Sequence, residues 1–414
     1  MPQQYEPTIN MPYEFSHIME GARPSEIREL LKYASMPGMI SFGGGMPNPK
    51  SFAIDAIREI VDDVLIKNGK YALQYGNTAG LPELREEIAK MVRETEGIEA
   101  ESKHIIVTTG SQQALYALPK VLVNPGETVI TEAPTYIGAI SAFNANGVRM
   151  AGIPMDKDGM KTDVLQATLE KMKSEGKKPK YIYVIPNFHN PAGYTMSLER
   201  RKHLVDLSND SGIPIVEDNP YGELRFSGRK LPSIKSLNPG GEVTYLGTFS
   251  KVMTPGLRIG FAISSEAVVG KINLLKQAVD LSTNTLSEFI AMEYLKRGIM
   301  KVQIPKTIEL YRKKRDLMLS SLEKYFPEGS DWSRPDGGMF IWAEVDSGID
   351  TTAMIRKALE KKVAYVSGAS FFPDGSKRNN MRLNFTFSED DQIVEGIRRL
   401  GEVVSSELKI AKEA

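Results

Sequence analysis

Short apolar runs alternate with longer amphipathic segments through the first two-thirds of the chain. The runs are rich in β-branched residues and end in turn-forming residues, as strands do: HIIVTTG, ETVITEAP, VRMAGIPM, YIYVIPN, IPIVEDNP, VTYLGTFS and RIGFAISS. Helical periodicity lies between most of them, as at 111–123, 197–211 and 266–281. This alternation predicts an α/β fold with a large domain at 50–295, in which helices cover a mostly parallel, seven-stranded sheet of buried strands.

The last third of the chain has a different pattern. A long helical pattern at 304–325 precedes the strand-like GGMFIWAEV, and a helix around 352–361 precedes the strands VAYVSG and MRLNFT and a final helix from Ser388. This order predicts a smaller α+β domain at 296–414. We expect the segment 1–49, which includes SEIRELLKYA, to form an arm that joins it. The length of 414 residues exceeds what one hydrophobic core usually serves, so two domains are expected.

Composition excludes several kinds of site. The chain has no cysteine, which rules out disulfides, thiolate catalysis and cysteine-bound zinc, and its four histidines are isolated from one another. Lys+Arg and Asp+Glu both number 52, so the zero net charge argues against a nucleic-acid or membrane-surface protein. No apolar run is long enough to span a membrane, and the polar N-terminus does not resemble a secretory signal. We expect a cytoplasmic protein.

Polar residues at the ends of the predicted strands are the main candidates for a site, because ligands of open α/β sheets bind at the carboxyl ends of strands. After HIIVTT, the residues Gly110, Ser111 and Gln112 open a helix whose free N–H groups suit a phosphate. Simple capping by Ser111 is the alternative. The chain has neither a G-x-G-x-x-G fingerprint nor a Walker A sequence, which argues against a dinucleotide or a nucleoside triphosphate.

Two other strand ends carry candidate side chains. Asp218 follows the apolar run IPIV, and a buried carboxylate there needs a cationic partner or hydrogen-bond donors, unless it only caps a turn. Tyr221, three residues later, could place a phenol on the same cavity. Asn190 precedes a proline in NFHNPAG, where an ordinary Asn-Pro turn is the alternative. His189 beside it could serve as a base, although most isolated histidines are structural.

The stretch TFSKVMTPGLRIGF contains a candidate nucleophile. Lys251 follows an apolar strand, with Thr248 and Ser250 before it and Arg258 after it. A nucleophilic lysine must be partly neutral, which burial and nearby positive charge favour. A Schiff-base lysine, a carboxylate for a ring nitrogen and a phosphate cup are together what a pyridine aldehyde phosphate requires.

These motifs, in this order, resemble those of the class I and II aminotransferases, pyridoxal-phosphate enzymes of fold type I. The 2-aminoadipate/kynurenine aminotransferase subgroup is the most similar. The resemblance covers nearly the whole chain: SFGGGMPNPKSF, LQYGNTAGLPELREEIA, GSQQAL, APTY, NPAG, EDNPYG, SKVMTPGLRIG, GGMFIW and MRLNF. It implies pyridoxal 5′-phosphate as cofactor, ping-pong transfer of an amino group to 2-oxoglutarate, and a homodimer with shared active sites.

The resemblance also assigns roles around the cofactor ring. Lys251 would form the Schiff base and later move the substrate proton, and Asp218 would pair with the protonated pyridine nitrogen. Asn190 and Tyr221 would hydrogen-bond the 3′ oxygen of the ring. Tyr136, in APTY, would stack on the ring face, and an ordinary half-buried tyrosine is its alternative.

The same resemblance implies how the phosphate and the substrate are bound. Arg382 would bind the substrate α-carboxylate with a bidentate guanidinium, assisted by Asn190 and the backbone near Gly45. Tyr75, in LQYG, would reach the phosphate of the neighbouring subunit. The other expected phosphate ligands are Gly110, Ser111, Gln112, Thr248, Ser250 and Arg258.

The amino donor and three other activities stay open at this point. Arg23 lies in the segment that the subgroup uses as a mobile specificity element, and it could instead be an exposed arginine at a helix start. We expect broad specificity, with 2-aminoadipate, aromatic amino acids or leucine as donors.

A lyase or decarboxylase of this fold would share Lys251 and Asp218. A regulator with an aminotransferase-like domain would need a DNA-binding domain, for which we see no room before SFGGGMPNP, and a nicotinamide oxidoreductase would need the missing glycine fingerprint.

Overall fold

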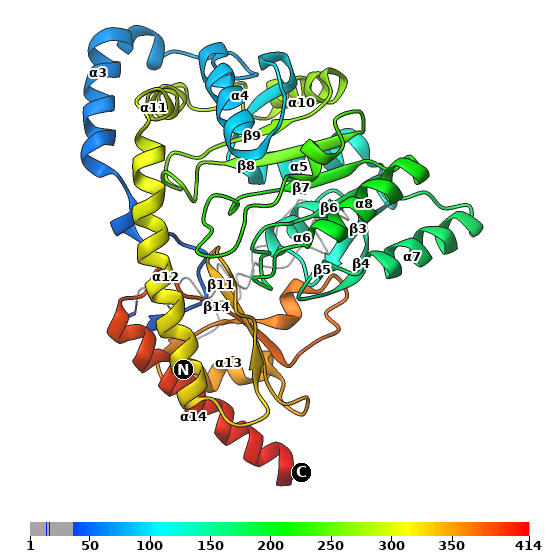
Figure 1. Ribbon diagram of the computed structural model, residues 1–414, viewed down its shortest axis with the longest axis vertical. Helices are drawn as coiled ribbons and strands as arrows, with labels where there is room; N and C mark the ends of the chain where they lie inside the picture. Colours follow the sequence, from blue (N-terminus) through cyan, green and yellow to red (C-terminus); the bar gives the residue numbers. More distant parts are fainter. Residues whose placement is uncertain (1–13, 15, 17–35, 414) are drawn as a thin grey trace.

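The computed structural model describes residues 14, 16 and 36–413 of the chain. Arg23 and the expected helix SEIRELLKYA therefore lie outside the described residues. A larger body built on one sheet lies above a smaller one in Figure 1, and the long helix α12 (Ile299–Tyr325) runs along one side of both.

The larger body is built on an eight-stranded sheet with the order β2-β9-β8-β7-β6-β3-β4-β5. Each of the predicted strands is present, and the α/β class is confirmed. The predicted number of seven was wrong because β5, only two residues long, folds back on β4 at Gly159 and is too short to show a hydrophobic pattern. The strands are β2 (Ile105–Thr109), β3 (Thr128–Ala133), β4 (Arg149–Asp156), β5 (Gly159–Met160), β6 (Ile182–Val184), β7 (Ile215–Asp218), β8 (Val243–Thr248) and β9 (Ile259–Ile263).

The sheet is mostly parallel. The pairs β4–β3, β3–β6, β6–β7 and β7–β8 are parallel, whereas β9 is antiparallel to both β2 and β8. The expectation that VRMAGIPM is a buried strand was wrong, because β4 lies beside the edge of the sheet and only Ile153 in it is buried.

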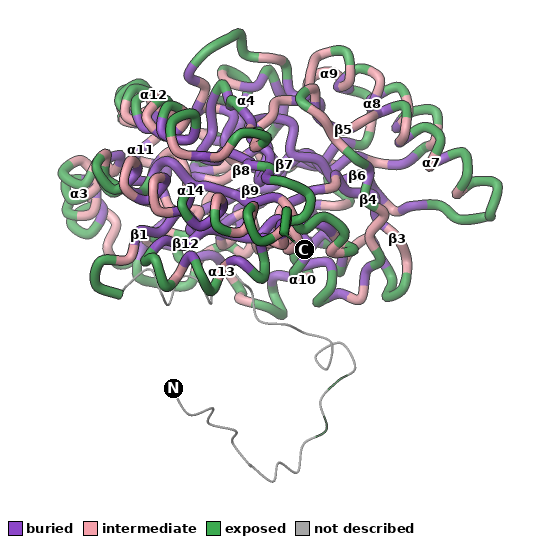
Figure 2. Tube along the Cα trace, turned by 90° about the horizontal axis from the view of Figure 1, so that it is seen from below, coloured by how far each residue is buried: buried purple, intermediate pink, exposed green. Residues whose placement is uncertain are grey.

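Helices cover both faces of this sheet. Successive side chains of a strand point to opposite faces, so neighbouring apolar residues of one strand pack against different helices. Ile105 and Val107 of β2 pack in a core with α3, α4 and α11, whereas Ile106 packs on the opposite face with α5, α6 and α10. Figure 2 shows the buried residues along the strands and the exposed ones on the outer sides of the helices. The helices are α3 (Ile54–Ala72), α4 (Pro82–Glu96), α5 (Ser111–Leu122), α6 (Ile137–Asn144), α7 (Thr162–Ser174), α8 (Leu198–Ser211), α9 (Ile234–Leu237), α10 (Glu266–Val279) and α11 (Thr285–Lys296), with the 3-10 turns η1 (Pro49–Ser51) and η2 (Ser102–His104).

The smaller body contains a four-stranded sheet with the order β10-β11-β14-β13 and a separate pair of β1 with β12. Ile40 and Phe42 pack in one core with Ile393 and Ile397 of α14, so the described end of the N-terminal arm belongs to this body. We keep 1–49, 50–295 and 296–414 as proposed boundaries. The elements are β1 (Ile40–Ser41), β10 (Asp331–Trp332), β11 (Phe340–Glu344), α13 (Thr351–Glu360), β12 (Val363–Ala364), β13 (Val366–Ser367), η3 (Gly368–Phe371), β14 (Asn380–Asn384) and α14 (Asp390–Glu413).

Candidate active site

A cavity of about 260 Å³ lies where β7 and β8 end, facing β11 and β14 of the smaller body. Gly110 lies directly behind it, because a Cβ there would come within 2.2 Å of Nη2 of Arg258. Tyr75 is elsewhere, with 82% of its surface exposed, and Arg23 is outside the described residues. The predicted residues that line the cavity are Gly45, Ser111, Gln112, Tyr136, Asn190, Asp218, Tyr221, Thr248, Ser250, Lys251, Arg258 and Arg382.

Asp218 forms the carboxylate end of the cavity. It is 3% exposed, and Tyr183 donates a hydrogen bond of 2.8 Å to its Oδ2. Oδ1 is buried and has no hydrogen-bond partner within the part of the chain that the structure describes. Burial raises the pKa of Asp218 to about 7, and the Tyr183 hydrogen bond only partly opposes this. The free oxygen suits a cationic N–H donor, such as a protonated pyridine nitrogen.

Lys251 supplies an amine at the end of β8. Its Nζ donates a hydrogen bond of 2.8 Å to the carbonyl oxygen of Gly45. Desolvation, followed by the positive charges of Arg382 and Arg258, lowers the pKa of Lys251 to about 8. About a tenth of the amine is therefore neutral at pH 7, far more than for an ordinary lysine, and a Schiff-base nucleophile requires this neutral form.

A cup of donors lies beside this lysine. The Thr248 hydroxyl donates to Ser250 Oγ over 3.0 Å, and Nη1 of Arg258 donates to the same oxygen over 3.2 Å. The first turn of α5, which begins at Ser111, adds free N–H groups and a positive helix end. A cationic guanidinium, two hydroxyls and a helix N-terminus together suit a phosphate dianion.

A glycine that sequence reasoning missed allows this cup to form. A Cβ on Gly260 of β9 would lie 2.5 Å from the backbone nitrogen of Ser111, so only glycine lets the strand pass so close to the start of α5. The RIGF motif contained this residue, but its role depends on the β2–β9 pairing, which places Gly260 opposite Thr108.

Arg382 places a guanidinium in the cavity, in addition to the carboxylate of Asp218 and the amine of Lys251. It is 1% exposed on β14, and it donates to Oδ1 of Asn190 over 2.9 Å and to the carbonyl of Gly43 over 2.7 Å. Its guanidinium carbon lies 4.2 Å from the centre of the Phe340 ring and 5.1 Å from that of Phe371. Burial lowers the pKa of Arg382 to about 10, so the group remains a cation near neutral pH. A buried cation of this shape suits a carboxylate.

Asn190 connects this arginine to the phenol of Tyr221. Its Nδ2 donates to Tyr221 Oη over 3.3 Å, while its Oδ1 accepts from Arg382. Tyr221 packs edge-on against Phe340, with the ring centres 5.9 Å apart. Burial raises the pKa of Tyr221, which keeps the phenol neutral and able to donate.

Tyr136 covers the cavity from the start of α6. Its hydroxyl donates to Oε1 of Gln112 over 3.4 Å, and Nε2 of Gln112 donates to the carbonyl of Gly138 over 2.8 Å. A Cβ on Gly138 would lie 2.4 Å from the Tyr136 ring, so glycine lets the ring fold over the helix start. The two side chains that line the cavity here therefore hold each other in place.

His189 lies outside the cavity lining, which favours the structural interpretation. It is 1% exposed, its Nε2 lies 3.0 Å from the Glu132 carboxylate, and its Nδ1 accepts from the backbone N–H of Ala192 over 3.3 Å. These contacts stabilise the turn that carries Asn190. Among the described residues there is also no group of His, Asp and Glu side chains that could hold a metal ion.

Tyr183 and Phe340 are further residues of the site that sequence reasoning missed. Tyr183 stands within an apolar strand, 35 positions from Asp218, and only the pairing of β6 with β7 brings the two side chains together. Phe340 begins a strand of the smaller body and contacts both Tyr221 and Arg382. An aromatic residue inside an apolar run carries no signal in one sequence that separates a site role from core packing.

Comparison with known proteins supports the chemistry of this cavity. The family model "Aminotransferase class I and II" matches residues 41–400. The chain belongs to the class I and II aminotransferases. The aromatic-amino-acid aminotransferase 1 of Thermococcus litoralis is 45% identical to this aminotransferase over 97% of each chain. The 2-aminoadipate transaminase of Thermus thermophilus is 38% identical over 93% of this chain and 95% of its own.

Solved structures of this family extend the likeness to the fold and the cofactor. The kynurenine aminotransferase of Pyrococcus horikoshii, in complex with PMP, has a TM-score of 0.92 and 44% identity, covering 95% of this chain and 97% of its own. This aminotransferase uses pyridoxal phosphate, and its membership of the kynurenine/aminoadipate/aromatic subgroup confirms the resemblance seen in the sequence. Its cavity fits the cofactor: the free oxygen of Asp218 suits the ring nitrogen, and the donors around Arg258 suit the phosphate. None of the described helices could cross a membrane.

Proposed function

We propose that this aminotransferase transfers the amino group of 2-aminoadipate, aromatic amino acids or leucine to 2-oxoglutarate by a ping-pong mechanism. The observation that carries the proposal is the convergence of Lys251, Asp218 and Arg382 on one cavity. An amine, a carboxylate and a guanidinium in that arrangement match the three groups that transamination must hold: an aldehyde, a ring nitrogen and a substrate carboxylate.

The protein would bind pyridoxal phosphate both at its pyridine ring and at its phosphate. Asp218 would bind the ring nitrogen, and Asn190 and Tyr221 the ring oxygen, while Tyr136 would pack on the ring face. Bound there, the cofactor supplies an electron sink for negative charge at the substrate Cα. The phosphate ligands would be Gly110, Ser111, Gln112, Thr248, Ser250 and Arg258.

Lys251 would then act as the proton carrier of the reaction. Its Nζ, with a pKa lowered to about 8, would accept a proton from the substrate Cα and deliver it to C4′ of the cofactor, and would carry it the opposite way in the reverse half-reaction. Arg382 orients the substrate by its α-carboxylate, and Phe340 and Phe371 keep water from the guanidinium. Exclusion of water strengthens the ion pair between the guanidinium and the substrate.

One cavity can serve both half-reactions because donor and acceptor share an α-carboxylate. The relatives named for aromatic amino acids, kynurenine and 2-aminoadipate support a broad range of donors. We propose Arg23 as the residue that binds a distal side-chain carboxylate, and Asn190 and the Gly45 backbone as assistants of Arg382.

The experiment that tests this function combines a spectrum with a donor panel. The purified enzyme should be yellow, and borohydride should bleach it by fixing the cofactor to Lys251. Each donor should yield its 2-oxo acid and glutamate in equal amounts from 2-oxoglutarate. Release of CO₂ or ammonia instead, without glutamate, would favour the decarboxylase or lyase alternative. A colourless Lys251→Ala protein with full activity would overturn the mechanism.

The same panel tests the specificity proposal. Arg23→Ala should weaken the binding of the 2-aminoadipate donor about tenfold or more, seen as a rise in its KM, while leaving leucine nearly unchanged, because only the former has a distal carboxylate. Arg28→Ala, in the same segment, is the matched control. An equal loss for both donors would remove Arg23 from this role.

A further inference from the structure

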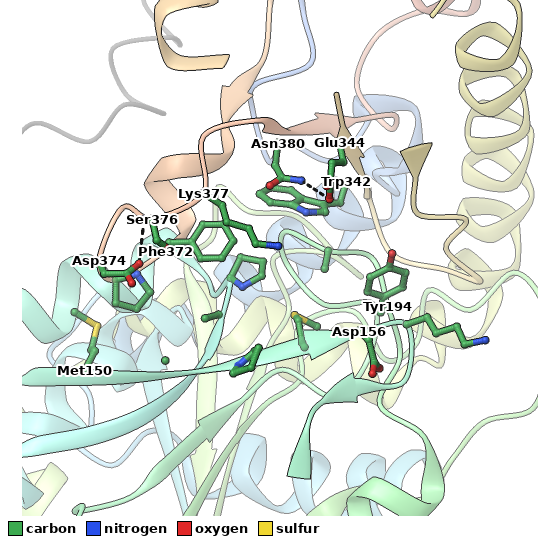
Figure 3. Close-up of a pocket in the computed structure, with 18 residues that line it drawn as sticks. Met150, Asp156, Tyr194, Trp342, Glu344, Phe372, Asp374, Ser376, Lys377 and Asn380 are labelled. Carbon is green, nitrogen blue, oxygen red and sulfur yellow. Dashed lines mark hydrogen bonds between the residues drawn. The ribbon is translucent and has the colours of Figure 1, made fainter. Parts of the chain in front are cut away.

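A larger cavity, of about 530 Å³, lies apart from the catalytic one, and none of the described residues lines both. It is bounded by β4 of the large sheet on one side, and by β11 and the segment 372–377 of the smaller body on the other (Figure 3). Its volume is within the range of roughly 300–1,000 Å³ that is typical of small-molecule sites. Nothing in the proposed transamination uses it.

Aromatic rings form much of this cavity's wall. Trp342 and Phe372 are each 8% exposed, with ring centres 6.5 Å apart, and Tyr194 is half-buried. Figure 3 shows Tyr194 across the cavity from Phe372, with the Trp342 ring above. Flat apolar walls of this kind favour a planar aromatic ligand over a flexible polar one.

The carboxylates that line the cavity already have donors. Asp156 accepts two hydrogen bonds from Arg200, at 2.6 and 2.8 Å. Glu344 accepts from Nδ2 of Asn380 over 3.2 Å, and Asp374 accepts from a backbone N–H over 3.1 Å. Arg200 therefore neutralises the charge of Asp156, whereas Glu344 and Asp374 accept from neutral donors and keep their negative charge.

The two lysines of the lining are not paired in this way. Lys157 and Lys377 are exposed, and neither forms an ion pair with any residue that the structure describes. Figure 3 shows the side chain of Lys377 running from the segment 372–377 toward the middle of the cavity, beside Phe372. Glu344 and Asp374 already accept hydrogen bonds, so the ammonium of Lys377 is the charged group of this lining that is available to a ligand, and its complement is an anionic group.

The walls of the cavity are continuous with the residues that would bind substrate. Trp342 pairs with Arg382 in the β11–β14 ladder, and Phe371 packs against both, 5.6 Å from the Trp342 ring and 5.1 Å from the guanidinium carbon. On the opposite wall, the carbonyl of Tyr194 accepts from the backbone N–H of His189 over 2.8 Å, in the turn that carries Asn190.

We propose that this cavity is a second binding site, for a small aromatic carboxylate, and that its occupancy weakens substrate binding at Arg382. The ring of the ligand packs against Trp342 and Phe372, and its carboxylate pairs with Lys377 and Lys157. A ligand in this position holds the Trp342–Phe371 packing in place. Arg382 is then less free to exchange its present acceptors, Asn190 and the Gly43 carbonyl, for a substrate carboxylate.

The composition of the chain provides a direct reporter. It contains two tryptophans, Trp332 and Trp342, so Trp332→Phe leaves Trp342 as the only one. Phenylacetate, titrated into this holoenzyme variant, should change the Trp342 fluorescence and reach saturation. Cyclohexylacetate, which lacks the aromatic ring, and benzyl alcohol, which lacks the charge, should each bind at least tenfold more weakly.

Lysine variants separate this site from the catalytic cavity. In the Trp332→Phe background, Lys157→Met with Lys377→Met should weaken phenylacetate binding at least tenfold, whereas Lys173→Met, another exposed lysine, should leave it unchanged. Phenylacetate should raise the KM for the amino donor severalfold, and the double variant should lose that effect. Binding that is unaffected by the two lysines would overturn the proposal, as would a Trp342 signal that does not saturate. The fluorescence titration does not depend on activity, so its outcome and that of the donor panel can be told apart.

Discussion

At the residue scale, burial moves the two central ionisable groups of the catalytic cavity toward neutrality. The pKa of Asp218 rises to about 7 and that of Lys251 falls to about 8, mainly through desolvation. Among the described residues, neither group has an oppositely charged hydrogen-bond partner: Asp218 accepts from a phenol, and Lys251 donates to a carbonyl. A cofactor with a cationic ring nitrogen would supply the charge that Asp218 lacks.

The carboxyl of Asp218 should make the cofactor-free enzyme less stable as pH rises. An unfolded aspartate has a pKa of about 3.9, so between about pH 4 and 7 the folded chain keeps a proton that the unfolded chain has lost. The contribution of this group to the free energy of unfolding therefore falls as pH rises through that window. Each pKa unit is worth about 1.4 kcal/mol, so the effect reaches a few kcal/mol.

Asp218→Asn should remove this part of the pH dependence. Urea unfolding of the cofactor-free protein at pH 5 and pH 8 measures it, and the variant should lose less stability between the two than the wild type. Asp62→Asn, at an exposed position on α3, is the control and should behave as the wild type. Identical curves for Asp218→Asn and the wild type would show that the buried carboxyl ionises normally.

At the element scale, a polar network lies behind the turn from β2 to α5, whose N–H groups we propose to bind the cofactor phosphate. Lys276 of α10 is 1% exposed, and its Nζ donates to Gln113 over 2.9 Å, to both oxygens of Asp280 over 3.2 Å and to Thr283 over 3.2 Å. Gln113 in turn accepts from the backbone N–H of Thr109 over 2.8 Å and donates to Asp280 over 2.6 Å. Burial lowers the pKa of Lys276, and the Asp280 charge opposes this.

Lys276→Met should weaken cofactor binding, although Lys276 does not line the cofactor cavity. Removal of the ammonium takes one donor from Gln113 and from Thr283 and takes the cationic partner from Asp280, which costs about 1–3 kcal/mol of stability. Phosphate binding should weaken with it, seen as faster loss of the yellow colour on dialysis at a temperature where the variant is folded. Lys271→Met, exposed on the same helix, is the control. A less stable variant that keeps its cofactor as long as the wild type would show that the network supports only the fold.

At the scale of the whole molecule, large apolar side chains gather on the outside near α3. Ile66 is 81% exposed, Leu73 72% and Tyr75 82%, which is unusual for a surface that stays in contact with water. The segment that carries Tyr75 is held against α11, where the Thr285 hydroxyl donates to the carbonyl of Gln74 over 2.9 Å. This arrangement supports the proposed homodimer, in which Tyr75 reaches the cofactor phosphate of the partner.

Mixed dimers test whether Tyr75 acts across the interface. Tyr75→Phe should weaken cofactor binding severalfold, and Lys251→Ala should abolish activity. A mixed dimer of the two variants contains one site with Lys251 and an intact Tyr75 from the other subunit, so it should regain tight cofactor binding at that site. Tyr71→Phe is the control for Tyr75→Phe, because Tyr71 is also exposed and lies at the end of α3, four residues before Tyr75. No recovery in the mixed dimer would place Tyr75 in its own subunit's site or outside any site.

Much of the fold and of the candidate site could be predicted because it depends on local patterns. The strands, the helix at Ser111 and the cup formed by Thr248, Ser250 and Arg258 lie within short stretches, so periodicity and turn residues reveal them. The short strand β5 could not be predicted in this way, because two residues show no period. Nor could the partial exposure of β4, because burial depends on which strand becomes the edge.

The sequence by itself determined the α/β class, the positions of the strand ends and the residue types available there. Only the tertiary structure decided which of them meet: Lys251 with Gly45, 206 positions apart, Arg382 with Asn190, 192 apart, and Tyr183 with Asp218. It also decided their pKa values, since desolvation depends on what covers a group. The physical reason is that periodicity records which face of an element is apolar, whereas the packing of two bodies against each other decides what that face covers.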